Sequence, residues 1–79
     1  MVFTATIEYT TSMNEAEKLG KNLKQIRTAK GISQGEISRI LEVDKGFVSN
    51  IENGKTNPTL ATITKIAKAI GVSVRDLMK

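Results

Sequence analysis

Residues 32–55 carry the pattern that decides the fold, and they read ISQGEISRILEVDKGFVSNIENGK. Ser33 and Glu36 stand at capping-box spacing, in which each side chain bonds the backbone amide of the other residue at the start of a helix. The apolar residues that follow recur at helical spacing and predict a buried face made of Ile37, Ile40 and Leu41. The stretch therefore begins with one short helix.

A second short helix follows after a tight junction at Val43 and Asp44. Asp44 is a natural N-cap, and we expect the helix to run over about 44–53 with Val48 and Ile51 pointing inward. Two short helices joined by a brief turn, the second opening on exposed polar residues, are the arrangement that lays one helix in the major groove of DNA.

The helical pattern continues on both sides of this stretch. Before it, Asn14 and Glu17 resemble a capping box, and apolar spacing predicts a helix over about 14–30 that Gly31 ends. Gly20 lies inside that helix at a cost of about 1 kcal/mol, so we expect its first turn to fray.

After the stretch, Asn57-Pro58 predicts a loop and Thr59 a helix cap. The expected apolar stripe of this helix consists of Leu60, Ile63, Ile66, Ala67 and Ile70. Gly71 ends it, and Ser73 caps a last turn that includes Val74, Leu77 and Met78. The predicted fold class is all-α with five helices, forming one domain over residues 14–79.

Residues 1–13 form a separate N-terminal arm in this interpretation. Residues 2–10 alternate, with Phe3, Ala5, Ile7 and Tyr9 on one side, as in a half-buried strand. A lone strand cannot satisfy its own backbone groups, so the arm pairs with a second copy, lies on the helices, or is disordered. These alternatives stay open at this point.

The amino-acid composition limits which classes of function are possible. The 79 residues carry a net charge of +4 and contain no Cys and no His. A basic balance favours a polyanion as partner, while the missing residue types exclude Cys/His metal sites, thiol nucleophiles and histidine bases. We therefore expect no enzyme and no cofactor. No apolar run approaches a membrane span and no signal pattern begins the chain, so we expect a cytoplasmic protein without membrane contact.

Several spaced motifs together resemble the phage-repressor and Cro-like helix-turn-helix family, often called the XRE family. They are the Ile32–Lys55 stretch, Asn57-Pro58-Thr59 and the segment from Ala69 to Ser73, and the likeness covers about residues 19–78. The resemblance implies a lambda-repressor-like fold and binding to double-stranded DNA.

Four positions match the family's groove-facing residues: Lys45, Gly46, Ser49 and Asn50. They lie opposite the inward Val48 and Ile51 on a helical wheel. A lysine can donate to guanine O6 and N7, an asparagine can pair with adenine N6 and N7, and a glycine permits close approach to a base. The resemblance thus implies that these residues read bases.

The resemblance also implies phosphate contacts and a structural ion pair. The phosphate-binding positions are the Ser33 amide and Gln34 at the start of one helix, and Asn53, Lys55 and Thr56 after the next. Arg27 and Glu52 match an ion pair that ties two helices together beneath the DNA surface. Glu42 departs from the family, which usually has Gly in the turn, so the turn is expected to be slightly reshaped. Phe47 either packs on the scaffold or lies at the groove rim.

These observations predict a sequence-specific transcriptional regulator, a homodimeric repressor that reads a pseudo-palindromic operator. Phage-type, antitoxin and restriction-modification controller contexts fit equally, and an additional protein partner stays open. The rival interpretation is a protein-binding adaptor or coactivator of the same fold, which would bind DNA weakly and without preference. We expect the dimer surface at the last turn around Leu77 and Met78, at residues 3–9, or at both.

Overall fold

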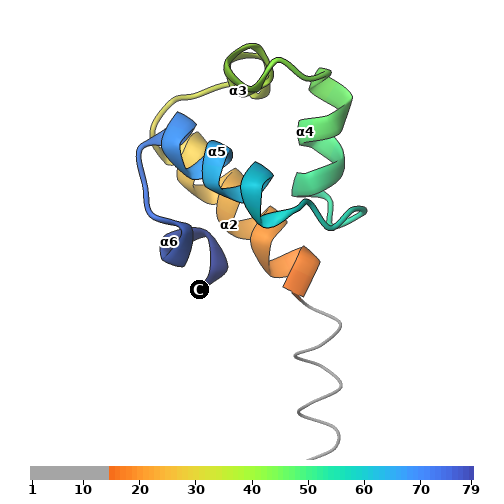
Figure 1. Cartoon of the computed structure of the whole chain (residues 1–79). Helices are drawn as coiled ribbons and strands as arrows, with labels where there is room; N and C mark the ends of the chain where they lie inside the picture. The colour runs from red at the N-terminus through yellow and green to blue at the C-terminus, as the bar shows by residue number, and fades with distance from the viewer. Residues whose placement is uncertain (1–14) are drawn as a thin grey trace, which may run out of the picture.

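The computed structural model describes residues 15–79 and contains five helices in that range (Figure 1). They are α2 (Glu15–Ala29), α3 (Gln34–Leu41), α4 (Lys45–Glu52), α5 (Leu60–Ile70) and α6 (Val74–Met78). This confirms the all-α prediction and the helix order. Three predictions lie outside the described residues: the strand over residues 2–10, the Asn14 cap and the domain boundary at residue 13.

Local caps set where most of the helices begin. The Ser33 hydroxyl accepts from the Glu36 amide at 3.0 Å while the Glu36 carboxylate accepts from the Ser33 amide at 2.9 Å, which completes the predicted capping box. Thr59 caps α5 by accepting from the amide of Thr62 at 3.2 Å. Asp44 occupies the N-cap position of α4, but its side chain makes no capping hydrogen bond there.

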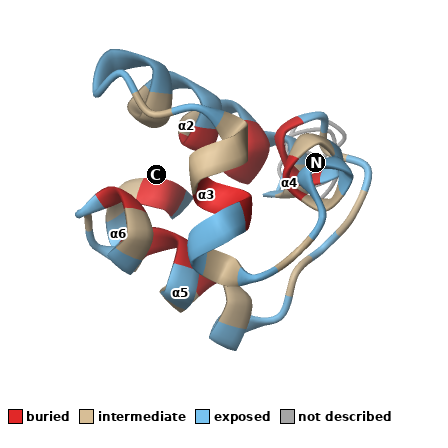
Figure 2. Cartoon of the chain, turned by 90° about the horizontal axis from the view of Figure 1, so that it is seen from above, coloured by how far each residue is buried: buried red, intermediate tan, exposed pale blue. Residues whose placement is uncertain are grey.

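One apolar core holds the five helices together. Helix α2 packs against α4 and α6, while α3 packs against α4 and α5, and α5 also meets α6. Figure 2 shows the buried segments of the helices turned toward this shared interior. The fully enclosed side chains come from every helix and are Leu23, Ile37, Val48, Ile51, Ile66 and Leu77. Among residues 15–79, no helix is both long and apolar enough to cross a membrane.

Gly20 allows α2 and α4 to pack closely. A Cβ atom at this position would lie 2.6 Å from the Glu52 carbonyl oxygen and nearer still to that of Ile51. Only a residue without a side chain fits so close to the backbone of α4. The glycine lies buried in α2, which is helical from Glu15 onward, so the expected fraying of the first turn is not seen, and the glycine has a packing role.

Two predicted core residues are exposed, and those predictions were wrong. Ile40 is 59% exposed because the side of α3 that packs into the core carries Ile37 and Ser38, which leaves Ile40 facing outward. Leu60 is 70% exposed because it begins α5, and helical side chains lean toward the N-terminus, past the end of the helix.

The prediction that Leu77 lies in the dimer surface was wrong, while the part that concerns Met78 stays a prediction. Leu77 is completely buried, and its carbonyl accepts a hydrogen bond from Nδ2 of Asn22 at 2.8 Å. The side chain therefore belongs to the core between α2 and α6 and cannot meet a second copy. Met78 beside it is exposed, whereas residues 3–9 lie outside the described range.

Candidate nucleic-acid interface

Helix α4 has two distinct faces. Val48 and Ile51 are completely buried on the inner face. The outer face carries the four residues predicted to read bases, with Lys45, Gly46 and Asn50 exposed and Ser49 half-buried. The structure thus brings these four residues together on the side of α4 that faces away from the core.

The chemistry of this outer face suits the edges of base pairs. The ammonium group of Lys45 can donate to guanine O6 and N7 in the major groove. The carboxamide of Asn50 can both donate to and accept from adenine N7 and N6. A Cβ atom built at Gly46 would have nothing within 4 Å. No packing contact within the domain therefore requires glycine at this position.

The turn between α3 and α4 closes although it lacks the usual glycine. Glu42 adopts the left-handed conformation, with φ of 59° and ψ of 47°, and is the one non-glycine residue with positive φ among residues 15–79. Its amide donates to the Arg39 carbonyl at 3.3 Å, and the Val43 amide donates to the Ser38 carbonyl at 3.0 Å. A non-glycine residue pays about 1–2 kcal/mol for this conformation.

A hydrogen-bonded network around Glu52 connects α2, α3 and α4. Arg27 forms a two-pronged ion pair with the Glu52 carboxylate, through Nε and through Nη2, the latter at 3.0 Å. Arg27 Nη1 also donates to the Ile32 carbonyl at 3.0 Å. The Glu52 side chain is only 2% exposed, and its hydrogen bond with Arg27 raises the pKa of the guanidinium. The structure thus brings the two residues of the expected ion pair together beneath the outer face of α4.

The same carboxylate holds Gln34, one of the predicted phosphate ligands. Nε2 of Gln34 donates to Glu52 Oε1 at 2.8 Å, so the carboxamide is anchored at the start of α3. The Ser33 amide, also predicted to meet phosphate, donates to Glu36. The amides of Gln34 and Gly35 lie in the first turn of α3, where backbone donors have no acceptor within the helix. They are better placed than the Ser33 amide to bind an anion.

The loop after α4 is anchored at its start. Gly54 adopts a positive φ of 71°, and a Cβ there would come within 2.9 Å of Glu17 Cγ, so the loop lies against the first turn of α2. The Lys55 amide donates to the Asn50 carbonyl at 2.9 Å, and Asn53 Nδ2 donates to Ser49 Oγ at 3.4 Å. Lys55 and Asn53 are exposed and Thr56 is half-buried, and of these three predicted phosphate ligands Asn53 contacts the outer face of α4 through Ser49.

The sequence did not predict two of the contacts that hold this region together. The contact between Gly54 and Glu17, and the bond between Gln34 and Glu52, join residues far apart in the chain. The Asn53-Gly54 pair indicated only that a helix ends there. For Phe47 the structure favours the scaffold, since its ring is partly buried and packs against the core.

A capped helix, a tight turn and a second helix with a polar outer face together define a helix-turn-helix DNA-binding domain. A comparison with protein families gives the same answer, because the family model described as "Helix-turn-helix" matches residues 23–77. The chain belongs to the helix-turn-helix family of DNA-binding transcriptional regulators.

Transcriptional regulators similar to this chain belong to the same class of protein. The HTH-type transcriptional regulator DdrOP3 of Deinococcus deserti is 31% identical over 62 residues, which are 78% of this chain and 48% of that protein. This chain therefore spans about half the length of that curated relative. The restriction-modification controller protein C.AhdI of Aeromonas hydrophila is 35% identical in its crystal structure, with a TM-score of 0.74 over 78% of this chain and 94% of that one.

A further solved relative was crystallised with DNA. The restriction-modification controller protein C.Esp1396I, as a tetramer in complex with its natural 35 base-pair operator, superposes with a TM-score of 0.68. It is 25% identical, and the match covers 81% of this chain and 95% of that one.

Proposed function

We propose that this chain is a homodimeric repressor that reads a pseudo-palindromic operator with α4 in the major groove, and that it acts by binding alone. The observation that carries the proposal is the division of α4 into two faces. The inner face is buried, whereas Lys45, Gly46, Ser49 and Asn50 line the outer face and leave the core intact. The side chains of Lys45 and Asn50 match the donor and acceptor pattern of base edges.

Within this proposal the flanking segments hold the DNA backbone. A phosphate meets the first-turn amides of α3 near Gln34, and a second phosphate meets Asn53, Lys55 and Thr56. The Glu52 network joins the two segments, because Gln34 at the start of α3 donates to Glu52 at the end of α4. The recognition helix is thereby seated between two backbone contacts.

The homodimer is supported by the surface near α4. A single recognition helix reads only a few base pairs, so a useful operator needs two half-sites. Leu60 is a large apolar side chain, 70% exposed, that begins α5 directly after the loop that follows α4. We expect Leu60→Glu to leave the fold intact and lower the mass measured in solution toward that of a monomer. If the Leu60→Glu protein is still a dimer, the dimer interface lies on another surface.

A restriction-modification controller is the more specific candidate. The observation in its favour is that the match with C.AhdI covers 94% of that controller protein. If this chain is such a controller, its operator should lie upstream of its own gene. A binding site found only at unrelated promoters would remove this candidate and leave the general repressor.

Selection from a random pool of duplex DNA tests the proposed function. We expect a two-fold symmetric site whose half-site centres lie about 10 base pairs apart, with affinity that falls steeply as salt is added. Asn50→Ala should weaken that site by about 1–3 kcal/mol and relax the preference at one adenine, while Gln25→Ala on α2 serves as the matched control. Weak binding without any motif, from folded protein, would favour the adaptor over the repressor.

A further inference from the structure

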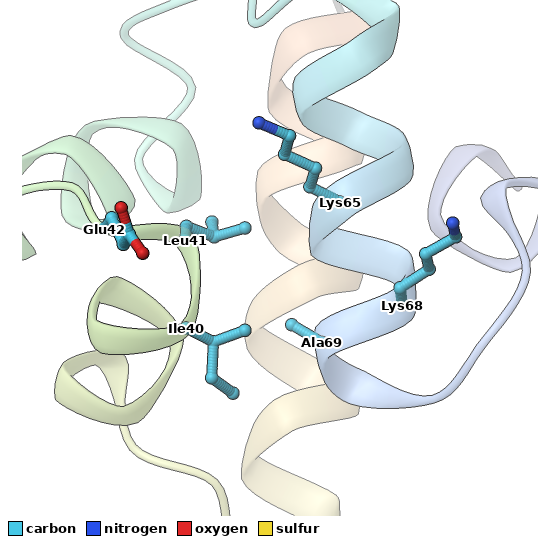
Figure 3. A pocket seen from close by; sticks show the side chains of 6 residues that line it. All are labelled: Ile40, Leu41, Glu42, Lys65, Lys68 and Ala69. Atoms are coloured by element: carbon cyan, nitrogen blue, oxygen red, sulfur yellow. The ribbon is translucent and has the colours of Figure 1, made fainter.

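A shallow hollow lies between the end of α3 and the outer side of α5. Its volume is about 410 Å³, and Figure 3 shows the side chains that line it. They are Ile40, Leu41, Glu42, Lys65, Lys68 and Ala69. None of them belongs to the DNA-binding residues proposed above.

The floor of the hollow is apolar. Ile40 and Ala69 face each other across it from α3 and α5, with Leu41 beside them (Figure 3). Leu41 and Ala69 are half-buried, but Ile40 is 59% exposed. Helical spacing alone would have put Ile40 in the core, so its exposure beside two other apolar side chains leaves a surface suited to an apolar partner.

The α5 side of the hollow is cationic. Lys65 and Lys68 stand one turn apart on the same face of α5, and both are exposed. Within residues 15–79 the ion pairs are Arg27 with Glu52 and Lys79 with Asp76, so neither lysine has a carboxylate partner. Glu42 supplies one carboxylate to the lining, and the two ammonium groups outnumber it.

We propose that this hollow docks an acidic amphipathic helix of another protein. An apolar side chain of that helix covers Ile40 and Ala69, and its carboxylates meet Lys65 and Lys68. A groove between two helices accepts a third helix through ridge-and-groove packing, which an apolar anchor and flanking charges then orient. Nucleic acid would meet the lysines but leave the apolar floor uncovered.

Two occupants from the chain itself fit this surface less well. A second copy that used the same patch would place Lys65 and Lys68 against their own symmetry mates, and like charges brought together oppose association. Residues 1–13 carry one carboxylate, Glu8, and no Lys or Arg. One carboxylate leaves one of the two lysines without a partner.

The hollow and the phosphate site proposed at Gln34 lie at opposite ends of α3. Gln34 begins α3 and Leu41 ends it, seven residues later, so the two ends are separated by about 10 Å along the helix axis. The first end belongs to the proposed phosphate site and the second to the hollow. The inference does not depend on DNA binding and is tested without DNA.

The test is a titration of the full chain with two designed peptides of about 15 residues. Both peptides share one leucine stripe, with glutamates on the rest of the surface of one and lysines in their place on the other. Fluorescence anisotropy measures affinity, and methyl NMR shows which side chains are contacted. We expect the glutamate peptide to bind and shift the methyl signals of Ile40 and Ala69, while the lysine peptide binds at least about tenfold more weakly.

Variants separate this site from general charge attraction. The double substitution Lys65→Glu and Lys68→Glu should weaken the glutamate peptide at least about tenfold, as should Ile40→Ser. Lys18→Glu with Lys30→Glu makes the same charge change at two exposed positions that line no hollow in the described part of the chain, and should have little effect. Circular dichroism melts confirm that each variant is folded.

Three results would overturn the proposal. One is equal weakening by the two charge-reversed double variants, which would mean that net charge alone attracts the peptide. Another is no binding up to about 1 mM peptide, since an affinity weaker than that is too low for a specific site. The last is a shift of the Ile40 methyl signals when residues 1–13 are deleted, with stronger peptide binding, because the arm would then be the natural occupant.

Discussion

Gly20→Ala should destabilise the domain, although alanine is the better helix former. Alanine in place of glycine inside a helix is worth about 1 kcal/mol of stability. The added Cβ, however, would lie 2.6 Å from the Glu52 carbonyl oxygen and closer still to that of Ile51. These atoms are backbone, so the collision is relieved only if α2 and α4 move apart.

The magnitude follows from these two opposing effects. Overpacking of a close contact costs about 1–3 kcal/mol, and a backbone collision belongs at the upper end of that range. After the gain in helix propensity, the net loss is about 2 kcal/mol. In a domain of this size each kcal/mol moves the melting temperature by about 4–8 °C, so we expect Gly20→Ala to melt roughly 8–16 °C below the wild type.

Gly46→Ala is the matched control, because it makes the same chemical change inside α4. A Cβ at position 46 would have nothing within 4 Å, so the propensity gain of about 1 kcal/mol should raise the melting temperature by about 4–8 °C. Far-UV circular dichroism at one protein concentration measures both variants. A Gly20→Ala protein that melts at or above the wild-type temperature would refute the close approach of α2 and α4. Gly46→Ala should also bind DNA more weakly, which separates the fold from recognition.

Further predictions concern the turn, the acid response and the ion pair. Glu42→Gly should relieve the left-handed strain and stabilise the domain by about 1 kcal/mol, and an unchanged or lower melting temperature would argue against strain there. The Ser73 amide and hydroxyl lower the pKa of Asp76 below 3.8, so its contribution to stability is present above that value and disappears as the pH falls through the lowered pKa. Melts between about pH 5 and pH 2 should therefore fall less steeply for Asp76→Ala than for the wild type. Arg27→Ala leaves the buried Glu52 carboxylate without its cation and should cost about 3–5 kcal/mol of unfolding free energy. If that variant instead melts like the wild type but no longer binds DNA, Arg27 is a DNA ligand.

The helix boundaries could be predicted because their causes are local. The capping box of Ser33 and Glu36 lies within four residues, and the left-handed glycine at position 71 ends α5 where the pattern stops. Such signals depend on neighbours along the chain and need no knowledge of how helices pack. The outer face of α4 was predictable for the same reason, since eight residues of known period place Val48 opposite Asn50.

Contacts between helices were harder to predict. Helical spacing gives a set of apolar residues but not the direction of the core, which is why Ile40 and Leu60 were assigned inward and are exposed. Gly20 looked like a weakness of α2 because the backbone of α4 beside it cannot be read from sequence order. Likewise, no local pattern indicates that Gln34 donates to Glu52, eighteen positions away.

The separation of the two faces of α4 makes the domain a scaffold for engineering. None of the side chains at positions 45, 46, 49 and 50 belongs to the buried core, and the positions that hold α4 in place are Val48, Ile51 and Glu52. A library that randomises the four outer positions should therefore consist mostly of folded proteins. Selection from that library would yield domains with new target sequences and an unchanged hydrophobic interior.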